Sequence, residues 1–116
     1  MSYEEIEKRQ RDYCESQNVQ YLPAYKDSNA SLALSTQRLL PINGLRHPPE
    51  GGHNGWFLWC GEELSADPNF FSNIHTHHLT VLRPEVLEFL GLPPGYRVLL
   101  AIDYVDVWYD PSLLNV

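Results

Sequence analysis

The sequence predicts an α+β fold in which a small antiparallel or mixed sheet packs with two or three helices. A helix-forming segment opens the chain, strand-like apolar runs lie at residues 55–60 and 96–102, and a short helical segment precedes the second run. This mixture of signals is typical of α+β proteins. The length of 116 residues suits one hydrophobic core, so we expect a single domain over residues 1–116.

The first element expected is a helix that runs from the start of the chain to about residue 17. Ser2 and Glu5 have the spacing of a helix capping box. Ile6, Tyr13 and Cys14 fall roughly on one stripe at helical spacing. We therefore expect this helix to lie across a sheet, with its other face in solvent.

The residues between this helix and the aromatic run carry weaker signals. No firm element is predicted for residues 18–34. Residues 38–42 are predicted to form a short strand at a sheet edge or a strand end, because Pro41 has no N–H to donate to a neighbouring strand. Residues 46–54 contain two prolines and two glycines, which excludes a helix there.

The aromatic run Gly55-Trp56-Phe57-Leu58-Trp59-Cys60 is predicted to be a strand that ends at Gly61. Side chains alternate between the two faces of a strand, so Trp56, Leu58 and Cys60 share one face while Phe57 and Trp59 share the other. Both faces are apolar. This pattern fits a central strand covered on both sides, and also a strand that offers an aromatic ring to a partner.

Two segments follow this strand. Residues 64–69 are expected to form a loop that Phe70 and Phe71 anchor, while residues 73–79 give no clear assignment.

The last part of the chain is predicted to contain a short helix and a hairpin. Pro84 suits the first turn of a helix that ends at Gly91, where a left-handed cap is usual. Residues 96–102 are apolar and partly β-branched, as expected of a buried strand. Residues 105–109 are expected to pair with them as a hairpin.

The chain is acidic, with 8 Lys and Arg against 15 Asp and Glu and a net charge of −7. Nucleic-acid binding depends on neutralising phosphates with Lys and Arg, so no direct nucleic-acid ligand is predicted. A basic protein surface would instead be attracted. Solubility alone is the alternative explanation of the charge.

The expected location is the cytoplasm, without membrane association. No apolar run is long enough to span a bilayer, and the amino terminus is acidic where a secretory signal is basic. Cys14 and Cys60 are the two cysteines of the chain, and without a signal peptide they are expected to be reduced thiols.

Three histidines, His75, His77 and His78, lie within four residues. Clustered imidazoles suggest zinc binding or general-base chemistry, but the spacing matches no established metal motif. On a helix only His75 and His78 share a face, and on a strand His75 and His77 lack an obvious third ligand. Polar surface or helix-capping histidines are the favoured interpretation, so no metal and no cofactor is predicted.

Cys60 and the nearby acids are the other candidates for chemistry. Apolar neighbours and the charges of Glu62 and Glu63 both raise the pKa of a thiol at this position, which favours a structural cysteine over a nucleophile. Glu62 and Glu63, with Asp103, Asp106 and Asp110, would form either an acid–base pair or a negative rim that binds a basic partner. Solvated turn acids are equally compatible with the pattern.

Four segments together resemble a known group of proteins: Gly55 to Glu63, Asp67-Pro68-Asn69-Phe70-Phe71, Pro84 to Arg97 with its Leu-Gly-Leu-Pro-Pro-Gly turn, and Asp106-Val107-Trp108-Tyr109-Asp110. The chain is similar here to small bacterial immunity-type proteins of polymorphic toxin systems, over roughly residues 53–116. In those systems a cytosolic partner binds and neutralises one cognate toxin. The resemblance implies a non-enzymatic scaffold, with no catalytic residues to transfer.

The leading functional hypothesis is therefore a non-enzymatic protein that binds a cognate toxin with a basic surface and blocks its active site. The expected contact residues are Trp59, Glu62, Glu63, Tyr104, Asp106, Trp108 and Tyr109. The alternative is a metal-dependent enzyme or small-ligand-binding protein that uses the cluster of His75, His77 and His78. A third hypothesis is an adaptor domain whose Trp-rich surface holds a peptide. No oligomeric state is predicted.

Overall fold

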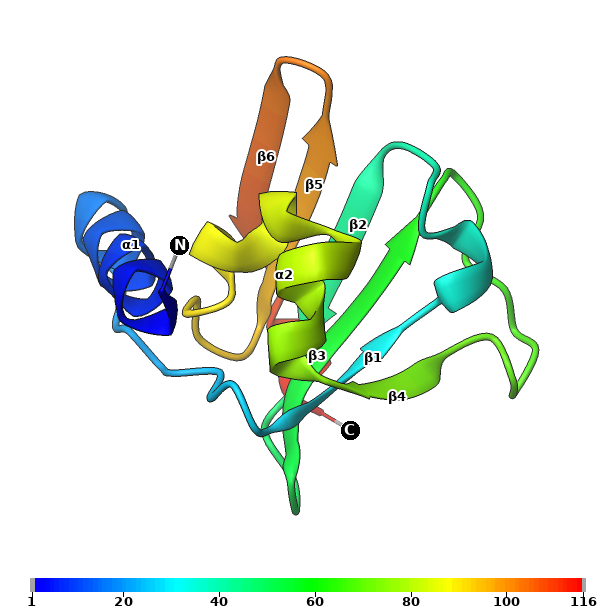
Figure 1. Ribbon diagram of the computed structural model, residues 1–116, viewed down its shortest axis with the longest axis horizontal. Helices are drawn as coiled ribbons and strands as arrows, with labels where there is room; N and C mark the ends of the chain where they lie inside the picture. Colours follow the sequence, from blue (N-terminus) through cyan, green and yellow to red (C-terminus); the bar gives the residue numbers. More distant parts are fainter. Residues whose placement is uncertain (1, 116) are drawn as a thin grey trace.

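The computed structural model describes residues 2–115 and contains one six-stranded mixed sheet with helices against it (Figure 1). Met1 and Val116, the two ends of the expected domain, lie outside the described residues. The strands are β1 (Asn29–Leu32), β2 (Ile42–Arg46), β3 (His53–Cys60), β4 (Ser72–His75), β5 (Tyr96–Ala101) and β6 (Tyr104–Tyr109). The α-helices are α1 (Tyr3–Ser16) and α2 (Leu79–Leu82), and the 3₁₀ helices are η1 (Leu34–Thr36), η2 (Thr76–His78), η3 (Pro84–Phe89) and η4 (Pro111–Leu114). The α+β prediction is confirmed.

The sheet has the order β4-β1-β3-β2-β5-β6, so β4 and β6 are its edge strands. β1 runs parallel to β3, and every other neighbouring pair is antiparallel. The strand predicted at residues 38–42 begins only at Ile42, and it lies inside the sheet, between β3 and β5, so the edge position is wrong. The alternative, that Pro41 stands at a strand end, agrees with the structure. Pro41 comes before the first ladder residue, so its missing N–H costs the sheet no hydrogen bond.

The first helix begins where the capping pattern predicts. The backbone N–H of Glu5 donates to Ser2 Oγ at 3.2 Å. Ile6, Gln10 and Cys14 are buried along one side of α1. Helix α1 lies beside the sheet (Figure 1) and packs against η3. The buried Gln10 side chain donates to the carbonyl of Leu87 at 2.9 Å.

The alternation predicted for residues 55–60 is confirmed, and it divides the core into two clusters. Trp56, Leu58 and Cys60 face the larger cluster, which α1 and η3 cover. Trp59 and Phe57 face the smaller cluster on the other side of β3. This smaller cluster also contains Ala33, Leu45, Phe70, Phe71 and Leu113. Phe70 and Phe71 thus anchor the loop before them, as predicted.

The helical segment at Pro84 is confirmed in place but differs in type and in its end. It is a 3₁₀ helix, and the backbone at Leu90 is still right-handed. Gly91 is not a left-handed cap, so that prediction is wrong. A glycine is required there by packing instead, because a Cβ on Gly91 would lie 2.5 Å from Cε1 of Tyr21.

The predicted hairpin is confirmed as β5 and β6, with Asp103 in the turn at a φ of 56°. The two segments left unassigned contain the remaining strands, β1 and β4, which pair with each other. Within residues 2–115, no helix has both the length and the apolar character needed to cross a membrane.

Candidate functional site

The edge strand β6 carries most of the exposed aromatic residues that the sequence singled out. Tyr104 is 53% exposed, Tyr109 is 49% exposed and Trp108 is 37% exposed. Asp106 lies among them and is also exposed. We refer to these four residues as the β6 surface. Such a combination of rings and an acid at a sheet edge offers anchoring area, charge and unpaired backbone groups to a partner.

The pairing register places the β6 surface on two sides of the sheet. The side chains of every second residue, Tyr104, Asp106 and Trp108, lie on one face of the sheet, and the side chain of Tyr109 lies on the other. On the first face, Trp108 pairs with Arg97, whose guanidinium carbon lies 5.9 Å from the indole ring centroid. Three of the four predicted contact residues of β6 are therefore presented together.

Arg97 also joins β6 to the segment that follows it. Its Nη1 donates to Asp110 Oδ2 at 3.0 Å. The hydroxyl of Ser112 donates to the other carboxylate oxygen of Asp110 at 2.6 Å. The hydrogen bond from Ser112, followed by that from Arg97, lowers the pKa of Asp110 below its ordinary value. Asp110 thus holds the end of β6 in place and is committed to structural contacts.

Glu62 and Glu63 are exposed, in the loop after β3. In the register of the sheet, Cys60 pairs with Ile42, Ile42 pairs with Leu100, and Leu100 pairs with Val105. The end of β3 and the start of β6 thus lie along the same end of the sheet (Figure 1). Three strand spacings of about 4.8 Å separate them by roughly 14 Å, a distance that one protein partner spans.

Trp59 does not belong to this surface. Its side chain is only 6% exposed and packs in the smaller cluster, with its ring centroid 6.3 Å from that of Phe71. The expectation that Trp59 offers its ring to a partner is wrong for this conformation. Strand alternation correctly placed Trp59 on the second face, but the loop carrying Phe71 and the segment carrying Leu113 cover that face.

An apolar groove that the sequence did not predict lies beside the hairpin. It has a volume of about 330 Å³ and lies between β5–β6 and η3, with Glu85 and Glu88 on its border. Three of its lining residues are large apolar side chains in open contact with solvent: Ile102 (78% exposed), Val105 (56%) and Leu40 (45%). The one sequence feature that indicates this groove is Ile102, a large apolar residue in the turn before Asp103, where polar residues are usual.

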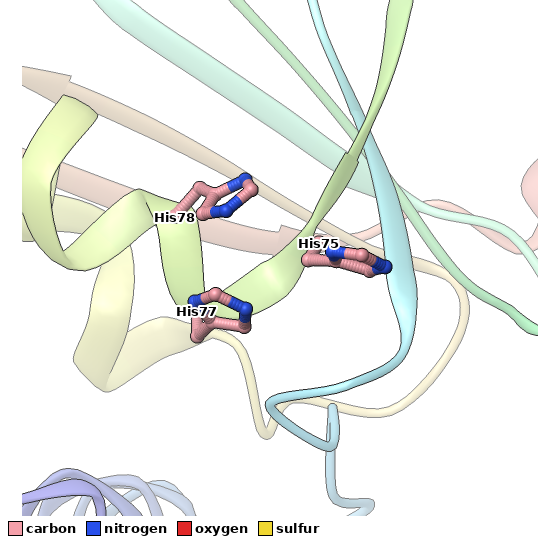
Figure 2. A group of neighbouring side chains, drawn as sticks. All are labelled: His75, His77 and His78. Atoms are coloured by element: carbon pink, nitrogen blue, oxygen red, sulfur yellow. The ribbon is translucent and has the colours of Figure 1, made fainter.

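The structure brings His75, His77 and His78 together at the opposite edge of the sheet (Figure 2). Each ring offers one nitrogen, and these three nitrogens lie within 4.8 Å of one another. A single helix or a single strand at residues 75–78 would bring only two of these rings together. The segment is in fact the junction of β4 and η2, and the change of direction there gathers all three rings.

The two upstream histidines do not join this cluster. His47 and His53 both pack against Phe57, with centroid distances of 5.4 Å and 5.1 Å to its ring. His47 Nδ1 is 2.9 Å from the carbonyl oxygen of Leu113, and His53 Nε2 is 2.9 Å from Ser31 Oγ. Burial, and then the neighbouring His47, lowers the pKa of His53. Both rings are engaged in structural contacts.

The cysteines are buried free thiols, as the sequence predicts. Cys14 and Cys60 are each 1% exposed. Burial raises the pKa of both thiols, and Glu85 raises that of Cys60 further, against the opposing effects of Arg83 and Thr36. A protonated, inaccessible thiol is a poor nucleophile, so Cys60 is a packing residue.

Comparison with known proteins gives one family match. Residues 9–110 match the family described as the Imm33-like domain. This match covers α1 from Arg9 onward, the whole sheet and the residues of the β6 surface. No curated protein and no solved structure matches the chain.

Proposed function

Because the chain belongs to the Imm33-like domain family, we propose that it is an immunity protein that binds one cognate toxin of a polymorphic toxin system. It neutralises the toxin by covering its active site and performs no catalysis itself. The contact surface consists of the β6 surface with Glu62 and Glu63. The observation that carries this assignment is the concentration of exposed aromatic and acidic residues on an edge strand.

Aromatic anchoring supports the assignment. Interface residues that dominate binding are most often Trp, Tyr and Arg. Trp108 is partly exposed and its ring rests against the guanidinium of Arg97. Because this contact holds the ring before binding, little side-chain entropy is lost when a partner covers it.

Charge supports a basic partner. The chain carries a net charge of −7, and Asp106, Glu62 and Glu63 are all exposed on the proposed surface. Such acids speed the encounter with a basic protein surface and disfavour acidic partners. The bound face of the toxin is therefore basic, as expected of an enzyme that acts on a polyanion such as nucleic acid.

The free edge of β6 supports strand pairing as the mode of contact. Edge strands are commonly protected by Lys or Pro, and the sequence Tyr104–Tyr109 contains neither. Its six residues leave a run of about 20 Å whose outer backbone groups are available to an extended segment of the toxin. Backbone pairing would then supply affinity, and the side chains of the β6 surface would supply specificity.

The test uses the toxin encoded beside this gene, mixed with purified protein to measure affinity and inhibition. Trp108→Ala should weaken binding by at least about 30-fold, the loss of roughly 2 kcal/mol that defines a dominant interface residue. Glu62→Lys and Asp106→Lys should slow association, most strongly at low salt.

Two matched variants control for general damage. Tyr25→Ala removes an exposed aromatic ring on the connection between α1 and β1. Glu50→Lys reverses an exposed charge next to the start of β3, at the end of that strand opposite Glu62. Both should bind as the natural protein does. If Trp108→Ala and Asp106→Lys bind the toxin with unchanged affinity, the β6 surface is not the contact site. If the natural protein does not inhibit the toxin, the proposed function is wrong.

A further inference from the structure

The three clustered histidines lie far from the proposed toxin surface in the order of the sheet. His75 ends β4, and His77 and His78 follow at once in η2. β4 is the edge strand opposite β6, with four strands between them. Any function of these histidines is therefore separable from toxin binding at the β6 surface.

The geometry of the rings is close to that of a metal site. Their three candidate nitrogens lie within 4.8 Å of one another. Zinc binds imidazole nitrogen at about 2.0–2.1 Å, so two nitrogens on one tetrahedral zinc are roughly 3.4 Å apart. Binding therefore requires the side chains to rotate until their nitrogens are up to about 1.4 Å closer to one another (4.8 − 3.4 Å). In Figure 2 the three rings surround a common space.

The backbone that carries the rings is held by buried contacts. Thr76, between His75 and His77, is fully buried. Its N–H and its hydroxyl both donate to the carbonyl of Ser28, at 2.9 Å and 2.8 Å, and its hydroxyl accepts from Asn54 Nδ2 at 2.8 Å. A ligand set whose backbone is already ordered loses less entropy when it binds an ion.

Two further hydrogen bonds hold the backbone of His77. The N–H of His77 donates to the carbonyl of Lys26 at 3.1 Å, and the His77 carbonyl accepts from the hydroxyl of Thr80 at 2.7 Å. The position of the 3₁₀ turn relative to β4 is thus set from both sides. His77 is half-buried, while His75 and His78 are exposed, so an ion reaches the site from solvent.

The ring nitrogens themselves have no other partner among residues 2–115. His47 and His53 each have a ring nitrogen within hydrogen-bond distance of a protein oxygen, at 2.9 Å. None of the three clustered rings has such a bond to any described residue. Instead the rings contact each other, with centroids 5.6, 5.6 and 4.4 Å apart. Hydrogen bonds to the protein thus explain why imidazoles stand at His47 and His53, but they do not explain the three clustered histidines.

We propose that His75, His77 and His78 form a binding site for one divalent transition-metal ion. Imidazole ligands suit Zn²⁺, Ni²⁺ and Cu²⁺, whereas Mg²⁺ and Ca²⁺ prefer oxygen ligands. Three protein ligands leave one tetrahedral position open to water. The ion would link the end of β4 to η2, and it would stabilise the folded protein by RT ln(1 + c/Kd), which grows with the free zinc concentration c.

The test titrates Zn²⁺ into protein purified without a histidine tag, by calorimetry, and Co²⁺ by its visible absorption. We expect one ion per chain and the intense absorption of tetrahedral Co²⁺. Loss of a partner in the outer shell of a metal site costs about 10–100-fold in affinity, so loss of an inner ligand should cost at least about 100-fold. His75→Ala, His77→Ala and His78→Ala should each show this loss.

His47→Gln provides the matched control, because it removes an imidazole outside the cluster, and its zinc affinity should be unchanged. Urea unfolding without metal checks that each variant folds. Added Zn²⁺ should raise the unfolding midpoint of the natural protein and of His47→Gln, and should leave the midpoints of the three alanine variants unchanged. An affinity unchanged by any one of the three alanine substitutions overturns the proposal. Half an ion per chain also overturns it, because that stoichiometry means a site between two molecules.

Discussion

Replacing Arg46 with methionine should strongly destabilise the fold, because this side chain is a buried connector and not a surface charge. Arg46 is 1% exposed and lies at the end of β2. Its guanidinium donates to five backbone carbonyls, those of Leu22, Pro23, Asn54, Leu90 and Leu92, at 2.8–3.3 Å. It therefore ties the segment after α1 to the segment after η3.

The size of the effect follows from the acceptors left behind. No other donor within residues 2–115 reaches the carbonyls of Leu22, Pro23 and Leu92. Burial lowers the pKa of Arg46 to about 10, so the group is still charged at neutral pH but costs free energy to bury. Charge-assisted hydrogen bonds contribute about 1.5–3 kcal/mol each, and the burial cost offsets part of their sum. We expect Arg46→Met to lower the free energy of unfolding by about 3–5 kcal/mol.

Urea unfolding at neutral pH measures this loss, with Arg46→Lys as a milder variant that keeps the charge but not the planar fork of donors. Arg38→Met, at an exposed arginine, is the control and should change stability by less than about 0.5 kcal/mol. A loss below about 1 kcal/mol in Arg46→Met would refute the reasoning, since unpaired buried carbonyls cost at least that much.

Three further predictions concern single sites. Gly55→Ala should destabilise by at least about 3 kcal/mol in urea, because a Cβ there would lie 1.9 Å from the carbonyl oxygen of His47 and the φ of Gly55 is 96°; a near-neutral effect would contradict the backbone geometry. Burial raises the pKa of Tyr3 to about 12, so the stability that the neutral Tyr3 side chain contributes is complete below pH 10 and is lost as the pH rises through 12. Tyr3→Phe should therefore remove the step at the highest pH from the titration of tyrosine absorbance. If that step stays, it belongs to another tyrosine. The hydrogen bond from Ser112, and then that from Arg97, lowers the pKa of Asp110, so the stability that the Asp110 carboxylate contributes is complete above pH 3.8 and is lost as the pH falls through the lowered pKa. Asp110→Asn should make the free energy of unfolding less dependent on pH below 3.8. An unchanged pH dependence in this range would exclude the contribution.

Short-range patterns predicted the first helix, the aromatic strand and the hairpin correctly. The capping pair Ser2 and Glu5 located the first helix, and the hairpin of β5 and β6 followed from two apolar runs around a turn. These signals depend on contacts between residues close in sequence, so the printed chain contains them in full.

The errors lie where distant segments meet. Nothing near residues 29–32 shows that they form β1, because that strand exists through its pairing with β3 and β4. An edge position was one of the two alternatives for the strand beside Pro41, and it is wrong because β5 pairs with the other side of that strand, which the sequence does not show.

The candidate surfaces divide in the same way. The acidic charge, the alternation of side chains along β3, and the aromatic and acidic residues of β6 are all readable from the amino-acid order. The burial of Trp59, the exposure of Trp108 and the meeting of three histidines at one point appear only once the chain is folded. Local periodicity sets the direction in which a side chain points, whereas its solvent exposure and its neighbours depend on segments far away in the chain.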